Sequence, residues 1–163
     1  MNRESRIKRT GGFTLIEVLV VMALIILIGV ITLVSLLGRK SRRTLDTATT
    51  QLVATFREAE SRAVAQSQNT AWGVHLDNTT TTSAFYALFS SSSYAQAYEA
   101  NHYRLPAGVF FTTSTVPAGS SKNVVFFQMT GATASTTIGL MMPASVGTST
   151  AIITIDTSGF VSF

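Results

Sequence analysis

The sequence contains no cysteine, and only 12% of its residues are charged, about half the usual share for a globular protein. Without cysteine there is no disulfide, no thiol nucleophile and no thiolate metal site. The two histidines, His75 and His102, lie in different segments. The sequence also lacks the signatures of a hydrolase triad, a zinc protease, a phosphate-binding loop and a dinucleotide-binding loop. It therefore predicts no catalytic residues, no metal site and no cofactor.

What the chain has instead is one long apolar run near its N-terminus. Residues 13–37 read FTLIEVLVVMALIILIGVITLVSLL, contain no proline and carry a single charge, on Glu17. At 1.5 Å per residue, a helix of this length would span roughly 37 Å, enough to cross a bilayer. An ionisable residue inside such a helix is costly and usually has a partner. Glu17 therefore marks a candidate functional position.

The formal net charge of +4 is unevenly distributed. Basic residues gather before and after the apolar run, at Arg3, Arg6, Lys8, Arg9, Arg39, Lys40, Arg42 and Arg43. From Thr44 onward the chain has four basic and six acidic residues, a net charge of −2, which argues against nucleic-acid binding by this part. The cluster at 39–43 fits either a solvated collar at the end of a membrane helix or a contact with lipid headgroups or phosphates.

The stretch KRTGGFTLIEVLVVMALIILIGVI, from Lys8 to Ile31, resembles the class III signal of type IV pilins and type II secretion pseudopilins. The resemblance implies that a prepilin peptidase cuts between Gly12 and Phe13, which removes the basic leader 1–12, and that the new amino terminus on Phe13 is N-methylated. It also implies that Glu17 pairs with the Phe13 ammonium of a neighbouring subunit in a filament. Cleavage would thus create the opposite charge that a buried carboxylate requires.

The resemblance also implies partners and a location. The partners are other pilin or pseudopilin subunits, the prepilin peptidase and methyltransferase, and an assembly platform in the inner membrane. The chain would cross the bacterial inner membrane once, with its N-terminus in the cytoplasm and its C-terminal domain outside, before it enters a surface filament or a periplasmic pseudopilus. Charge counting gives no orientation, because four basic residues lie on each side of the apolar run.

The remaining sequence predicts an α+β fold of the pilin-like kind. Apolar residues recur every three or four positions from Leu45 to Ala63, as in an amphipathic helix. We therefore expect one helix over about 13–65, with a transmembrane and filament-core part at 13–37 and an amphipathic half within 38–69. This second half is expected to pack on an antiparallel β domain, 70–163, made of one small sheet or a pair of sheets.

Within that domain, alternating residues predict a hairpin of strands 70–77 and 82–89. The segment 91–100 is expected to be a loop. Further strands are expected at 108–113, 123–129, 137–142, 150–156 and 159–163, because apolar and β-branched runs there are separated by turn residues.

Three segments resemble H-type minor pseudopilins and FimT-like minor pilins. They are FREAESRAVAQSQNTAWGVHLD at 56–77, VVFFQMTGAT at 124–133 and AIITIDTSGFVSF at 151–163. This resemblance favours a structural subunit, a minor pilin or a pseudopilin. Two alternatives stay open: a minor pilin at the filament tip that binds DNA or a surface ligand, and the major pilin itself.

Overall fold

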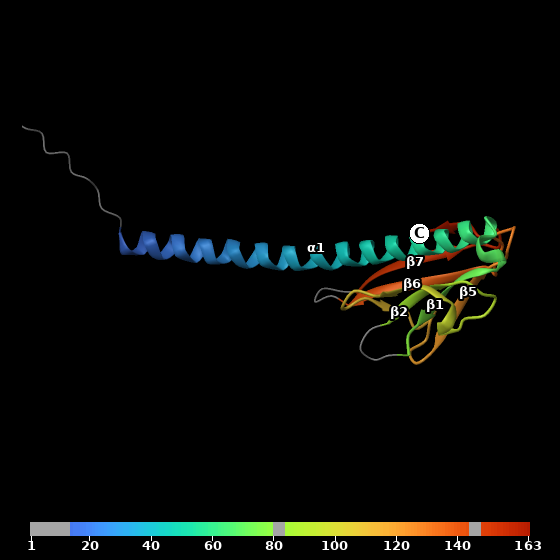
Figure 1. Ribbon diagram of the computed structural model, residues 1–163. Coiled ribbons are helices and arrows are strands. Elements are labelled where there is room, and N and C mark those ends of the chain that lie inside the picture. Colours follow the sequence, from blue (N-terminus) through green and yellow to red (C-terminus); the bar gives the residue numbers. More distant parts are fainter. Residues whose placement is uncertain (1–13, 80–83, 144–147) are drawn as a thin grey trace, which may run out of the picture. The chain divides into compact units, whose positions relative to one another are not determined.

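A computed structural model describes residues 14–79, 84–143 and 148–163, with the side chains of 31–40 excepted. The chain divides into two compact units, Met1–Leu37 and Gly38–Phe163. Helix α1 spans Leu15–Val64 and is followed by antiparallel strands (Figure 1). The predicted α+β fold, a long N-terminal helix packed on an antiparallel β domain, is confirmed.

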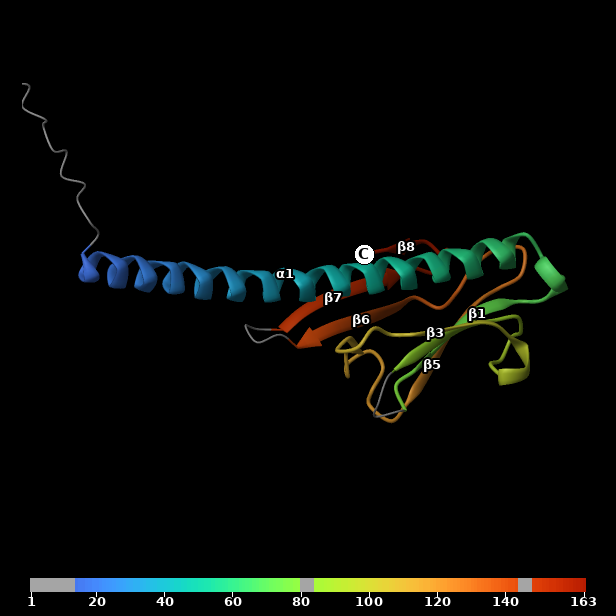
Figure 2. The ribbon, with the colours of Figure 1, turned by 60° about the vertical axis from the view of Figure 1, so that its left-hand side comes forward.

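The strands that the structure describes form two four-stranded antiparallel sheets (Figure 2). Their bounds are β1 Trp72–Asp77, β2 Phe85–Phe89, β3 Glu99–Arg104, β4 Phe110–Phe111, β5 Ser121–Phe126, β6 Thr136–Pro143, β7 Thr148–Ile155 and β8 Val161–Ser162. The first sheet has the order β3-β2-β1-β5 and the second the order β4-β6-β7-β8. β1 and β2 pair antiparallel, as the hairpin prediction requires.

One strand of the first sheet was not predicted. The segment 91–100 was expected to be a loop, but it contains a short 3-10 helix, Gln96–Tyr98, and the start of β3. β3 pairs antiparallel with β2 and has no buried side chain. A strand without a buried face shows no alternation of apolar and polar residues, so its sequence carries no strand signal.

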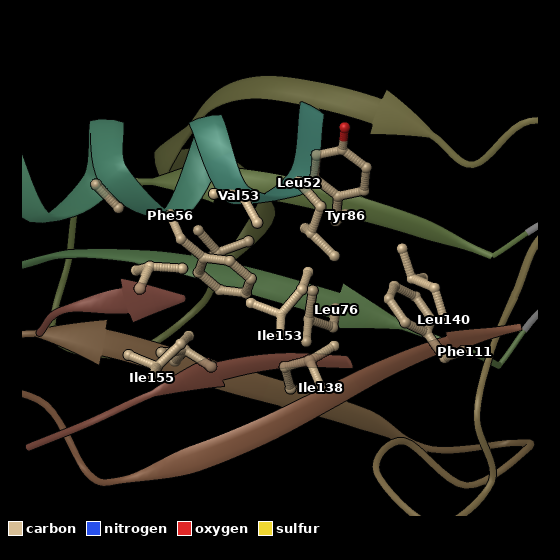
Figure 3. Packing of buried hydrophobic residues seen from close by; sticks show 14 of the residues in the cluster. Leu52, Val53, Phe56, Leu76, Tyr86, Phe111, Ile138, Leu140, Ile153 and Ile155 are labelled. Carbon is tan, nitrogen blue, oxygen red and sulfur yellow. The ribbon is translucent and has the colours of Figure 1, made fainter. Parts of the chain in front are cut away.

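The core of the second unit is built on the predicted apolar stripe of α1. Six residues of this stripe are at most 3% exposed: Leu45, Ala48, Leu52, Phe56, Ala59 and Ala63. Figure 3 shows Leu52, Val53 and Phe56 directed toward buried side chains of both sheets, among them Leu76 and Ile153. Complete burial of a side chain such as Phe56 contributes about 2–3 kcal/mol of hydrophobic free energy.

Polar contacts of the charged helix face hold the end of α1 to the strands. Arg57 Nη2 donates a hydrogen bond to the Val161 carbonyl at 3.2 Å. The Arg62 guanidinium lies 4.6 Å from the centre of the Trp72 ring and pairs with Glu58 one turn earlier. The helix therefore meets both sheets through side chains that lie beside its apolar stripe.

The turn before β8 predicts a large difference between two glycine substitutions. Gly159 has φ +93°, and a Cβ added there would lie 2.3 Å from the Gly131 carbonyl oxygen. Gly119 has φ +79° but open space around the same position. We expect Gly119→Ala to cost about 1 kcal/mol through its backbone conformation alone. Gly159→Ala should cost at least about 2 kcal/mol more, because the backbone of Gly131 must move.

Denaturant titration of the two variants, followed by near-ultraviolet circular dichroism in detergent micelles, measures this difference. If Gly119→Ala and Gly159→Ala lose the same stability, the turn at Gly159 does not pack closely against the backbone of Gly131.

Candidate assembly site at the start of the helix

Glu17 lies in the first turn of α1, three residues after Thr14. The Glu17 amide lies 3.1 Å from the Thr14 carbonyl oxygen and 3.4 Å from Thr14 Oγ1, and the Val18 amide donates to the same carbonyl at 3.3 Å. Thr14 thus occupies the N-cap position and satisfies amides that have no partner within the helix. A carboxylate in the first turn is also favoured by the helix dipole.

The role of Thr14 as a helix cap was missed in the sequence analysis. Thr14 and Glu17 have the threonine-x-x-glutamate spacing of a capping box, in which the glutamate can reach back to the amide of the cap residue. The same four residues, TLIE, lie in the stretch that resembles a class III signal and also define where the helix begins.

Apolar side chains surround Glu17 along the helix. Thirteen large apolar residues between Leu15 and Val30 are 48–80% exposed in the single chain. A contiguous apolar surface of this kind marks contact with other proteins or with lipid. Among the residues described, no helix is both long enough and apolar enough to cross a membrane. The membrane span at 13–37 stays a prediction.

Several predicted site residues lie outside the described residues. They are Gly12 and Phe13 at the expected cleavage point and the leader residues Arg3, Arg6, Lys8 and Arg9. Arg39 and Lys40 are helical, but their side chains are not described. Arg42 and Arg43 are exposed on α1, and Arg42 lines a cavity of about 420 Å³ with Asp46 and the start of β7. Exposure of this kind agrees equally with a solvated collar and with a phosphate contact.

The structure does not gather the four basic residues after Thr44 into one stripe. Arg104 and Lys122 lie on β3 and β5, the two opposite edges of the first sheet, about 14 Å apart at the usual strand spacing. Arg57 and Arg62 lie on α1 and contact Val161 and Glu58. These four residues therefore do not form the continuous basic surface that a nucleic-acid site requires.

His75 is a packed residue of the first sheet. It is 5% exposed, and its Nδ1–H donates to Asn123 Oδ1 at 2.6 Å. The ring of Tyr94 stacks on the imidazole with 3.5 Å between centroids, and Asp77 Oδ2 lies 3.6 Å from Nε2. Within the described part of the chain, no group of three or more metal-ligating side chains occurs.

Two ionisable groups beside His75 have shifted pKa values. Burial and the hydrogen bond to Glu99 raise the pKa of Tyr94 to about 12. Burial raises the pKa of Asp77, but hydrogen bonds from Thr79 and the charge of His75 outweigh it, so the net pKa is lowered. The Tyr94 hydroxyl therefore keeps its proton and donates it to Glu99 Oε1, and the Asp77 carboxylate accepts a hydrogen bond from the Thr79 amide.

Comparison with known proteins gives one match. Residues 7–36 match the family model described as the prokaryotic N-terminal methylation motif. This match supports the superfamily of type IV pilins and pseudopilins. No curated protein and no solved structure matches the chain.

Proposed function

We propose that this protein is a structural subunit of a type IV pilus or a type II secretion pseudopilus. The observation that carries the proposal is the methylation motif over 7–36, which ends within helix α1 and includes Glu17 in its first turn. The long helix on an antiparallel β domain supports it, since this is the fold that the family resemblance implies.

The assembly chemistry follows from the motif. A prepilin peptidase cuts between Gly12 and Phe13 and methylates the new amino terminus on Phe13. The cut leaves Thr14 as the second residue of the mature chain, one residue before α1 begins. The Glu17 carboxylate then pairs with the Phe13 ammonium of a neighbouring subunit, an ion pair that becomes strong where apolar helices exclude water.

The exposed apolar surface of α1 supports a proposed transfer of the subunit from the membrane into the filament. Before assembly, 13–37 anchors the chain in the bacterial inner membrane, with the leader in the cytoplasm and the β domain outside. The basic residues of the leader and of the cluster 39–43 flank this anchor. On assembly, the same helix leaves the lipid and packs against other subunits at the inner-membrane platform.

A minor pilin or pseudopilin role, of the H-type and FimT-like kind, is the finer proposal. The segment from Trp72 to Asp77 that carries part of this resemblance forms β1, and 151–163 forms most of β7 together with β8. A DNA-binding tip subunit is disfavoured, because the basic residues after Thr44 are spread over α1 and opposite sheet edges.

Deletion of the prepilin peptidase in the host tests the proposed function. With the peptidase present, immunoblots should find a shortened chain in both the membrane and the sheared extracellular or periplasmic filament fraction. Without the peptidase, the chain should keep its full length and stay in the membrane fraction. A chain whose size and location do not depend on the peptidase would refute the proposal.

A further inference from the structure

One edge of the first sheet is open. Among the strands that the structure describes, β5 is a terminal strand that pairs with β1 alone. The Asn78 amide donates to the Ser120 carbonyl at 3.0 Å, and successive residues of an antiparallel strand direct their backbone groups to alternate sides. Counted from this bond, Ser121, Asn123 and Val125 direct their N–H and C=O groups away from β1. These groups form a row without a strand partner.

A groove of about 460 Å³ runs along this open edge. One wall is β5 from Lys122 to Val125, and the other is the segment Thr133–Thr136 that leads into β6. The Phe127 amide donates to the Ala132 carbonyl at 2.8 Å, which joins the walls at one end. Beyond this bond the walls run into different sheets (Figure 2), and no backbone hydrogen bond between described residues crosses the groove.

The lining of the groove has one charge and several hydrogen-bonding side chains. Lys122 is its charged residue, and no carboxylate in the described part of the chain lies within ion-pair distance of it. Thr133, Ser135 and Thr136 add hydroxyl groups, and Phe127 is 62% exposed. A lysine on a sheet edge disfavours pairing with a neutral or basic strand. An acidic strand would instead place its carboxylate beside this ammonium.

We propose that this groove binds an extended acidic peptide segment of a partner protein, which adds as a further strand to β5. The backbone groups of Asn123 and Val125 would supply hydrogen bonds to the peptide, and side-chain contacts would supply its specificity. Lys122 selects an acidic residue, and Phe127 receives an apolar one. The groove lies within the unit Gly38–Phe163, so the proposal does not depend on the assembly role of Glu17.

Fluorescence anisotropy with defined peptides tests the proposal on the full chain in detergent micelles. The first probe is a fluorescein-labelled hexapeptide of alternating valine and glutamate, and the second replaces glutamate by lysine. The acidic peptide should bind, and the basic peptide should bind at least about tenfold more weakly. The substitution Lys122→Gln should reduce this preference, and added salt should weaken binding of the acidic peptide.

Val125→Pro tests the role of the open edge. Proline removes an N–H that β1 does not use, so an edge strand tolerates it, and loss of one hydrogen bond should weaken peptide binding about tenfold. Val125→Thr is the matched control, because threonine has nearly the same shape as valine and keeps the N–H. A second test leaves the protein unchanged and N-methylates alternate amides of the acidic peptide, which should also prevent binding.

Four results would overturn the proposal. They are no binding of the acidic peptide, full binding of the N-methylated peptide, unchanged binding by Val125→Pro, and an equal loss in Val125→Thr and Val125→Pro. Light scattering adds a further outcome. If the full chain self-associates and Val125→Pro prevents this, the edge pairs with a second copy of the chain and the acidic partner is refuted.

Discussion

Replacement of Glu17 by glutamine is expected to lower the amount of this subunit in filaments by at least about tenfold. The change keeps the size of the side chain but removes the negative charge. In the proposed filament contact, the Phe13 ammonium of the neighbour would then have no counter-ion in an apolar environment. Loss of one partner of a buried ion pair costs about 3–5 kcal/mol. The measurement is quantitative immunoblotting of sheared filaments and of the membrane fraction.

Asp46→Asn is the matched control for this substitution. Asp46 is an exposed carboxylate on the same helix, and its neutralisation removes the same charge without touching the proposed ion pair. It should leave incorporation unchanged. Because the Gly12–Phe13 bond and the basic leader are unchanged, Glu17→Gln should still be cut and should collect in the membrane. Normal incorporation of Glu17→Gln would show that Glu17 has no assembly role.

Replacement of Gly12 by valine is expected to lower the rate of leader cleavage by about a hundredfold, the effect of a small misplacement of a reacting bond. In the proposed site Gly12 contributes the carbonyl that the peptidase attacks, and a β-branched side chain next to that carbonyl obstructs its approach. The measurement is a cleavage time course with the full chain, prepilin peptidase and detergent, followed by mass spectrometry.

Gly11→Val provides the control, because it adds the same side chain one residue earlier. It should be cut far faster than Gly12→Val. If Gly11→Val is the variant that resists cleavage, the cut lies between Gly11 and Gly12. The mature chain would then begin at Gly12, and the proposed terminus at Phe13 would be wrong. Uncut Gly12→Val should also be absent from filaments, since no ammonium forms at Phe13.

The helix and its packing were predictable from local pattern. The repeat of apolar residues from Leu45 to Ala63 has the period of a helix, and all six residues of that repeat are buried. The β1–β2 hairpin was predictable for a similar reason, because each strand has a buried face and the strands are close in sequence.

The features that the sequence did not predict depend on which strands pair with one another. β3 has no buried side chain, so only its pairing with β2 identifies it as a strand. The position of β5 at a sheet edge depends on its pairing with β1, which lies far earlier in the sequence. Neither residue periodicity nor turn composition carries information of this kind.

The candidate assembly site also combines residues that have a signal in the sequence with a position that has none. Glu17 stands out because a charge interrupts an apolar run, and Thr14 was identifiable in principle from its spacing to Glu17. The cleavage point between Gly12 and Phe13 has no physical signal of its own in the sequence. Its prediction depends on the family resemblance, because the chemistry there belongs to the peptidase.

The most direct test of the account is the chemical identity of the N-terminus in assembled filaments. Mass spectrometry of sheared filaments should find a peptide that begins with N-methylated Phe13, and its abundance relative to other subunits separates a minor from a major role. A chain that begins at Met1 and is confined to the membrane would contradict the account.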